Sequence, residues 1–341
     1  IYRREYMKQK IIGLFGGSGF VGQNLAFFLA KQGYAVRVFT RHRKNTRDLW
    51  MNSSIEIIEV DLANQKHLAE ALSGCFSIVN LIGILNEKKD NGKEFINAHV
   101  RTLENILSAC ATAQISNFVQ ISALNADVNG NSFYLKSKGL AEDLLKTTFN
   151  KNSGVSAAFP NSITIIKPSV IFGARDAFTN KFASLLKYIP LFFPLAKGDV
   201  KFQPVYVGDL TALIFKYIEK PDQGVSTIHV GGPEIYTLKE ILSLIADIMG
   251  QKTKVIPLSN FLSCLQANFL EYVPGKPFSR DNLRSLSKDS ICLSSATTIG
   301  ERVETQSTSM KNILPTYLNY EGVRKQYLID EAISKEKNEN L

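Results

Sequence analysis

The 341-residue sequence lacks any uninterrupted run of eighteen or more apolar residues. A helix that crosses a bilayer needs about 20 such residues, so no transmembrane helix is expected. The sequence also lacks a CxxC pair, because its cysteines are widely spaced, at Cys75, Cys110, Cys264 and Cys292. This spacing argues against a disulfide framework or a zinc site and favours a reducing compartment, with each thiol in the core. No metal site is predicted.

A basic stripe interleaved with aromatic residues is missing as well, although the net charge is +9. This absence argues against nucleic acid as a partner. The excess of positive charge indicates instead an anionic cofactor and an anionic membrane surface as partners. The basic N-terminal residues Arg3, Arg4 and Lys8 precede an apolar stretch, Ile11 to Phe15, that is too short for a signal peptide. We therefore expect this stretch to be a first β-strand.

Short apolar stretches alternate with longer amphipathic ones in the first half of the chain. The predicted strands are Lys10–Phe15, Ala35–Thr40, Ile55–Val60, Ser77–Ile82, Asn117–Ile121 and Ile163–Lys167. The predicted helices between them are Phe20–Gln32, Gln65–Ser73, Glu94–Ala113 and Tyr134–Thr148. Strands that are apolar throughout are typical of a parallel sheet buried on both faces. The alternation predicts an α/β fold of the Rossmann type, with a doubly wound parallel sheet.

The pattern loosens after Gly173, which predicts a smaller C-terminal lobe on the substrate side. We expect a dinucleotide-binding core over residues 9–172, completed by residues 205–230. The lobe is expected to comprise residues 173–204 and 231–296, and residues 297–341 are expected to form a peripheral tail. The polar run Lys335–Asn340 is typical of such a tail.

A glycine-rich turn, Gly16-Gly17-Ser18-Gly19-Phe20-Val21-Gly22, joins the first predicted strand to the first predicted helix. Glycines permit a tight turn and let backbone N–H groups approach a pyrophosphate at the positive end of the helix. The spacing Gly-x-x-Gly-x-x-Gly differs from the GxGxxG pattern of the two-domain dehydrogenases. Its position directly after an apolar strand predicts a dinucleotide site, with a packing turn without ligand as the alternative.

The end of the second predicted strand bears on the choice between NAD and NADP. An NAD site usually places Asp or Glu there to bind the ribose 2′-hydroxyl. This chain has Thr40-Arg41-His42-Arg43-Lys44 and no acid. The guanidinium of Arg41 is suited to a 2′-phosphate, which favours NADP(H), with NAD(H) as the alternative. Asp61, after the third strand, is predicted either to lie near the adenine or to cap a helix.

Tyr134 and Lys138 lie four residues apart on a predicted helix, so both face the same side. A nearby ammonium favours the phenolate and lowers the pKa of a phenol, so such a pair can move protons to and from a substrate oxygen. Ser122, after the fifth predicted strand, is a third candidate catalytic residue. The alternative is that the pair binds the cofactor without turnover.

Together these motifs resemble the short-chain dehydrogenase/reductase superfamily, in its extended and atypical branches, over roughly residues 10 to 295. The motifs are the glycine turn, Asp61-Leu62, Val79–Gly83, Tyr134 with Lys138, and Lys167–Gly173. The resemblance implies cofactor contacts from Gly16, Gly17, Ser18, Gly19, Phe20, Val21, Arg41, Asp61, Leu62, Ile82, Gly83, Ile121, Tyr134, Lys138 and Pro168.

Three further stretches, Ile121–Asp127, Phe202–Leu210 and Val230–Thr237, are similar to the dehydrogenase-like accessory subunit of respiratory complex I and its bacterial relatives. That likeness implies a tightly held, largely structural NADPH. It also implies a peripheral position on the inner membrane, on the cytoplasmic or organelle-matrix side, next to respiratory-complex subunits.

Two positions depart from the pattern of active extended members. Their catalytic Ser or Thr falls on Ala123, with Ser122 one residue early, and their helix asparagine is replaced by His99. These departures favour an accessory or assembly factor of a respiratory NADH:quinone system. The alternatives are an active NAD(P)H-dependent oxidoreductase or epimerase that uses Tyr134 and Lys138, and a redox-sensing regulator. The apolar stretch Ile189–Leu195 is predicted to be either a packed loop over the cleft or an exposed docking patch.

Overall fold

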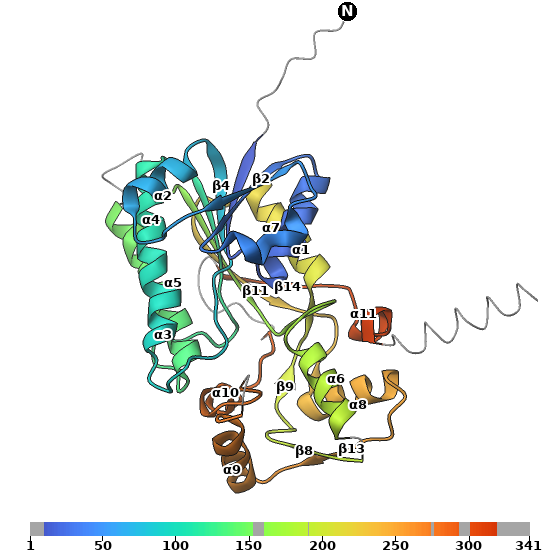
Figure 1. The fold of residues 1–341 in the computed structure, drawn as a ribbon. Helices are drawn as coiled ribbons and strands as arrows, with labels where there is room; N and C mark the ends of the chain where they lie inside the picture. Colours follow the sequence, from blue (N-terminus) through green and yellow to red (C-terminus); the bar gives the residue numbers. More distant parts are fainter. Residues whose placement is uncertain (1–9, 153–159, 190, 274–275, 293–300, 319–341) are drawn as a thin grey trace, which may run out of the picture.

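The computed structural model describes residues 10–152, 160–189, 191–273, 276–292 and 301–318. Its central feature is an eight-stranded parallel sheet in the order β14-β11-β6-β5-β4-β1-β2-β3 (Figure 1). The strands are β1 Ile11–Phe15, β2 Ala35–Thr40, β3 Ile55–Glu59, β4 Cys75–Asn80, β5 Asn117–Ile121, β6 Ser162–Pro168, β11 Gly224–Gly231 and β14 Glu301–Thr305. The predicted Rossmann-type α/β fold is therefore confirmed.

Helices cover both faces of the sheet, and this is why its central strands are mostly apolar. Helices α1 (Phe20–Lys31) and α7 (Val207–Glu219) pack on one face. Helices α2 (Gln65–Leu72), α4 (Thr102–Thr112) and α5 (Phe133–Asn152) pack on the other. Successive strand residues point to opposite faces, so Leu14 belongs to the first core and Phe15 to the second.

Strand β1 lies between β2 and β4 because the chain reverses its direction of winding there. It runs outward through β2 and β3 and then crosses back to β4 and β5. Such a switch point leaves a crevice at the carboxyl ends of the strands, where α/β proteins bind ligands. The glycine turn after β1 and the loop after β4 border this crevice.

The predicted helix Glu94–Ala113 is interrupted. The structure has α3 (Lys93–Ile96), a π-helical turn η2 (Asn97–Arg101) and α4 in succession. A π-helical turn inserts one residue into the helical repeat, and such turns are frequent at functional sites. The turn carries His99, whose side chain is buried. Residue propensities do not predict this turn.

A separate cluster of apolar side chains forms the core of a C-terminal lobe, built by the chain after β6. Its helices are α6 Thr179–Tyr188, α8 Leu238–Ile248, α9 Asn260–Leu270, α10 Arg280–Ser285 and α11 Met310–Leu318. Its short strands pair as β7 (Ile171–Phe172) with β10 (Val205–Tyr206), β9 (Lys201–Phe202) with β12 (Tyr236–Thr237), and β8 (Phe192–Leu195) with β13 (Lys254–Pro257). The predicted boundaries between core and lobe stay a prediction.

The predicted tail, residues 297–341, is only partly peripheral. Residues 301–305 form β14, which pairs with β11 and extends the central sheet. Met310 and Leu314 of α11 are buried in the lobe core. The sequence Glu-Arg-Val-Glu-Thr of β14 is mostly charged, as an edge strand tolerates, and so gives no apolar strand signal. The run Lys335–Asn340 and the basic residues before Lys10 lie outside the described residues.

Within the described ranges no helix is long and apolar enough to cross a membrane. The four cysteines are free thiols. Cys75 and Cys110 are buried as expected, but Cys264 is exposed and Cys292 is half-buried. Placing every cysteine in the core was therefore wrong, because Cys264 lies on the outward side of α9.

Candidate functional site

The glycine turn is closely packed, and its glycines are required by space as well as by conformation. Gly16 adopts a φ of +74°, and a Cβ there would lie 2.8 Å from the carbonyl carbon of Leu81. At Gly22 a Cβ would lie 2.4 Å from Gly16 O and 2.5 Å from Gly17 Cα. These contacts hold the first turn of α1 directly against the end of β1. Backbone atoms lie where the Cβ atoms of residues 16 and 22 would be, so neither position has room for a side chain.

The amino end of α1 has the chemistry of a phosphate site. The first N–H groups of a helix have no partner within the helix, and they carry its positive partial charge. Gly19 occupies the N-cap position and offers no side-chain acceptor to them. Gly19 itself is exposed, while Ser18, Phe20 and Val21 are half-buried around it. A pyrophosphate fits this open end, since it supplies the missing acceptors.

The loop after β4 brings the glycine turn and α5 together. Lys138 of α5 donates from Nζ to the carbonyl oxygens of Ile82, at 3.3 Å, and of Ile121, at 3.1 Å. A Cβ at Gly83 would lie 3.4 Å from Lys138 Nζ, so this glycine lies directly beside the ammonium. Burial lowers the pKa of Lys138 to about 8, opposed by the carboxylate of Glu142. The structure thus gathers the predicted residues Ile82, Gly83, Ile121 and Lys138.

Tyr134 lies one helical turn before Lys138, with its ring edge-to-face on His99 at 5.8 Å between centroids. The ring is half-buried. Removal from water raises the pKa of the Tyr134 phenol to about 12. The predicted lowering of this pKa by the Lys138 ammonium is therefore wrong. Two backbone carbonyls hold that ammonium instead, and burial dominates at the phenol.

His99 is fixed in one tautomer by its neighbours. Its Nε2 accepts a hydrogen bond from the Ile84 N–H at 3.2 Å, so the ring proton must sit on Nδ1. Nδ1 lies 2.7 Å from Ser137 Oγ, and that hydroxyl donates onward to the Tyr134 carbonyl oxygen at 2.8 Å. Burial and the Lys138 charge lower the pKa of His99 to about 2. The ring is therefore neutral, as a packed and hydrogen-bonded histidine should be.

We expect this histidine to make folding sensitive to acid. Its pKa is about 2 in the folded protein and 6.5 ordinarily, so below pH 6.5 the unfolded chain takes up a proton that the folded chain refuses. The free energy of unfolding should fall as the pH drops below that value, by up to about 1.4 kcal/mol per pH unit from this group. Denaturant unfolding of wild type and His99→Gln over a pH series measures this contribution. The exposed His67, as His67→Gln, is the matched control, and equal slopes in all three proteins would contradict the assignment.

Ser122 makes a contact that the sequence did not indicate. Its hydroxyl donates to Glu142 Oε1 at 2.5 Å, and Lys167 Nζ lies 2.8 Å from Glu142 Oε2. All three side chains are buried. Glu142 follows Lys138 by one helical turn, so Tyr134, Lys138 and Glu142 share one side of α5. In this arrangement the hydroxyl hydrogen of Ser122 is donated to Glu142 and not to a substrate.

The remaining predicted cofactor contacts lie at the carboxyl ends of other strands. Arg41 directly follows β2 and is exposed. Asp61 follows β3 and accepts a hydrogen bond from the Ala63 N–H at 2.9 Å, whereas Asn64 caps α2. The alternative of Asp61 as the helix cap is therefore wrong. Leu62 is half-buried beside it, and Pro168 ends β6.

Sequence reasoning missed the contacts that α10 makes with this end of the sheet. The buried Asp281 accepts from the backbone N–H groups of Phe133, at 2.6 Å, and Tyr134, at 3.1 Å, and so caps α5. Arg284 binds both carboxylate oxygens of Asp90, in the loop that follows Gly83. The capping-box pattern that starts at Ser279 signals a helix start. Nothing local signals which helix Asp281 caps.

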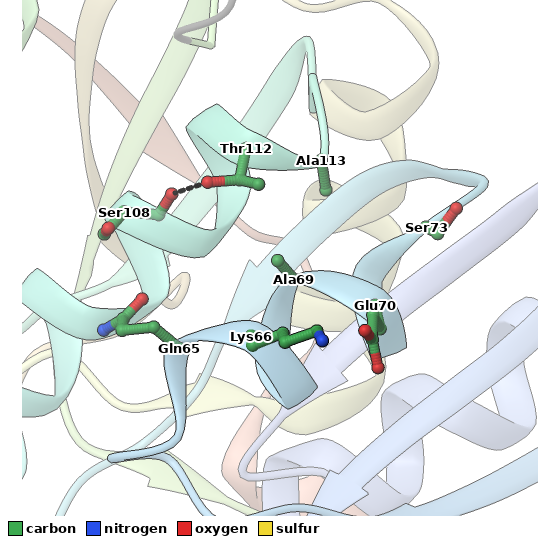
Figure 2. Close-up of a pocket in the computed structure, with 8 residues that line it drawn as sticks. All are labelled: Gln65, Lys66, Ala69, Glu70, Ser73, Ser108, Thr112 and Ala113. Atoms are coloured by element: carbon green, nitrogen blue, oxygen red, sulfur yellow. Dashed lines mark hydrogen bonds between the residues drawn. The ribbon is translucent and has the colours of Figure 1, made fainter.

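A surface groove between α2 and α4 is unrelated to this site. Figure 2 shows its lining by small and polar side chains from the two helices, including Gln65, Glu70 and Thr112. None of the lining residues belongs to the glycine turn or to the Tyr134–Lys138 pair. Among the described residues no cluster of histidine, cysteine and carboxylate side chains could hold a metal ion.

Comparison with known proteins finds relatives that align over most of this chain. The chain is 28% identical over 277 residues to NADH dehydrogenase [ubiquinone] 1 alpha subcomplex subunit 9, mitochondrial, of Dictyostelium discoideum, covering 79% of this chain and 73% of that protein. It matches 59% of the length of the Arabidopsis thaliana protein of the same description. It is also 25% identical over 248 residues to the ceramide reductase of Caulobacter vibrioides, covering 73% of each.

The fold agrees with a solved structure, MoeE5 in complex with UDP-glucuronic acid and NAD, at a TM-score of 0.65 and 16% identity. The superposition covers 92% of this chain and 99% of that one. The family model described as "NAD dependent epimerase/dehydratase family" matches residues 12–231, which include the glycine turn, Tyr134 and Lys138. The cofactor class is therefore a nicotinamide dinucleotide. The chain belongs to the NAD-dependent epimerase/dehydratase family of extended short-chain dehydrogenases/reductases.

Proposed function

We propose that this chain is an NADP(H)-binding accessory or assembly protein of a respiratory NADH:quinone system, in which the cofactor stabilises the fold. One observation carries the proposal. The glycine turn that suits a dinucleotide lies beside candidate catalytic residues whose polar groups are hydrogen-bonded to other groups of the protein. Lys138 is held by two carbonyl oxygens and Ser122 by Glu142. A ligand that binds only the folded state stabilises it by mass action, without any chemistry.

The phosphorylated cofactor is favoured by the end of β2. The residues from Thr40 to Arg47 include four that are basic and none that is acidic. Arg41 is exposed directly after the strand, where the ribose 2′-position of a dinucleotide on the glycine turn belongs. A guanidinium supports a phosphate there by paired, charge-assisted hydrogen bonds. The unphosphorylated NAD(H) is the alternative.

The relatives suggest where the protein works. The Dictyostelium and Arabidopsis proteins are by name mitochondrial subunits of NADH dehydrogenase. By analogy, we place this chain beside respiratory-complex subunits, peripherally on the membrane, on the organelle-matrix or cytoplasmic side. The basic net charge of +9 suits an anionic membrane surface.

An active reductase or epimerase is the second candidate, because Tyr134 and Lys138 are both retained and the Caulobacter relative is by name a reductase. A bound nicotinamide would supply hydride transfer. Tyr134, with its pKa raised to about 12, would keep its proton at neutral pH and could give it to a substrate oxygen.

Steady-state turnover separates the two candidates. We expect purified protein with NADPH to reduce no quinone, keto-sugar nucleotide or long-chain ketone above the rate of Tyr134→Phe, while both proteins retain cofactor. The reason is that Tyr134 packs as a half-buried ring on His99 and Lys138 is held by carbonyl oxygens. Sustained NADPH oxidation that Tyr134→Phe abolishes would overturn the accessory function and establish the enzyme.

A further inference from the structure

The C-terminal lobe has an exposed apolar surface that its own core does not cover. It consists of Leu191, Phe192, Ile256, Phe261, Leu265 and Phe269, which we call the apolar face. Phe261 and Phe269 are 77% and 71% exposed, values far above those of core phenylalanines. Large exposed apolar side chains scattered singly need no explanation, but a contiguous group marks an interaction surface.

The residues of the apolar face come from α9 and the β8–β13 ribbon, which lie together at the end of the lobe away from the central sheet (Figure 1). Gln266 Nε2 of α9 donates to the Pro194 carbonyl oxygen of β8 at 2.9 Å. Phe261, Leu265 and Phe269 are spaced four residues apart and therefore share one side of the helix. The opposite side is anchored, since Ser263 and Ala267 are fully buried.

The ribbon, a parallel pair of strands, carries apolar residues on its outward side as well as on its inward side. Phe193, Leu195 and Val255 point into the lobe core. Their neighbours Phe192, Pro194 and Ile256 point outward and are exposed. Of the outward residues of the two strands only Lys254 is polar, so the usual alternation of apolar and polar residues is largely lost.

Lysines predominate in the segments that build the apolar face. The two segments that build it, residues 177–198 and 248–270, contain five lysines and no aspartate or glutamate, while the exposed Asp199 and Asp247 directly adjoin them. Lys254 is paired in register with Phe192 and is exposed beside it. Lys197 Nζ binds Asn260 Oδ1 at the start of α9, at 2.8 Å. The nearest carboxylate along the chain after α9, Glu271, is buried against Arg280.

We propose that the apolar face is a docking surface for a membrane with anionic headgroups, on which α9 lies in the plane of the interface. An amphipathic helix of this kind buries aromatic and leucine side chains at the acyl boundary, and flanking lysines contact the headgroups. Tyr188 and Tyr272, each 84% exposed at the borders of the face, are suited to the headgroup level. The inference rests on the peripheral membrane location proposed above, and it names the surface of the protein that binds the membrane.

Flotation with lipid vesicles tests the proposal on the full chain. We expect binding to vesicles of phosphatidylcholine with phosphatidylglycerol, and much weaker binding to phosphatidylcholine alone. Leu265→Ser/Phe269→Ser should weaken binding about tenfold or more, since two side chains lose their burial in lipid. Lys252→Glu/Lys254→Glu should remove most of the preference for anionic vesicles, because each lysine contributes roughly fivefold. The matched control is Met51→Ser, which removes a 96%-exposed apolar side chain from the other domain.

The chain has one tryptophan, Trp50, which lies in the dinucleotide-binding domain. Phe269→Trp in a Trp50→Phe background therefore gives a single reporter on α9. Brominated lipids should quench this reporter and leave Trp50 of the wild type unquenched. Quenching of both or of neither would contradict the proposed orientation.

Three results would overturn the docking surface. Wild-type protein that floats with no vesicle, or binds neutral and anionic vesicles equally, is the first. The second is unchanged binding by Leu265→Ser/Phe269→Ser. The third is a solution dimer that this double substitution converts to a monomer, which would assign the face to a second copy. Cofactor content is measured on the same samples and does not depend on these three results. Failure of the cofactor proposal can therefore be distinguished from failure of the docking surface.

Discussion

Replacing Glu142 by alanine is expected to lower the free energy of unfolding by about 3–5 kcal/mol, the usual cost of removing one partner from a buried ion pair. Its carboxylate is contacted by Ser122 and by Lys167 at 2.5 and 2.8 Å. The substitution leaves the ammonium of Lys167 buried, with one remaining hydrogen bond, to the Ala126 carbonyl oxygen. Urea unfolding at neutral pH measures the change.

The matched control is the exposed ion pair between Arg175 and Asp48, at 2.7 Å. Asp48→Ala should cost less than about 1 kcal/mol, because solvent screens that pair. Glu142→Leu combined with Lys167→Met should recover much of the loss, since no unpaired charge is left in the core. If Glu142→Ala lowered the free energy of unfolding no more than Asp48→Ala does, the contacts of Glu142 with Ser122 and Lys167 would not be what stabilises the packing of α5 on the sheet.

Gly22→Ala is expected to produce a protein without cofactor. The new Cβ would lie within 2.5 Å of two backbone atoms of the turn, which cannot move away as a flexible side chain would. Helix α1 must shift away from Gly16, at a cost of about 1–3 kcal/mol for the overpacking alone. The displaced turn no longer presents its N–H groups to a pyrophosphate, so added NADPH should leave the melting temperature unchanged.

Gly74→Ala separates this effect from general strain. Gly74 has a positive φ of +78°, unlike Gly22, but no heavy atom lies within 4 Å of its Cβ position. It should lose about 1–2 kcal/mol for the left-handed conformation and keep the full response to NADPH. A Gly22→Ala protein that still melts higher with NADPH would show that the turn does not hold the cofactor.

The sheet and the cofactor turn could be predicted from sequence because local patterns encode them. Strands β2 and β5 agree with their predictions to the residue, since each is a short segment rich in apolar residues. The glycine turn was predicted for the same reason, as its spacing follows a strand directly. The order of strands around β1 then follows from the right-handed crossovers of such folds.

The rest could not be predicted, because it depends on partners far apart in the sequence. Ser122 was taken as a catalytic candidate, but its hydroxyl donates to Glu142, twenty residues away. Asp281 caps a helix that begins 148 residues earlier. Strand β14 is mostly charged and needs β11 to define it. The π-helical turn at His99 likewise has no marker in residue propensity.

The central claim is that this chain holds NADP(H) as part of its folded structure, and native mass spectrometry of the untreated protein tests it most directly. We expect one NADP(H) on each chain after purification without added cofactor. Gentle unfolding should release it, and the stripped protein should melt at a lower temperature. A spectrum dominated by bare protein of undiminished stability, or by NAD(H) instead, would contradict the account.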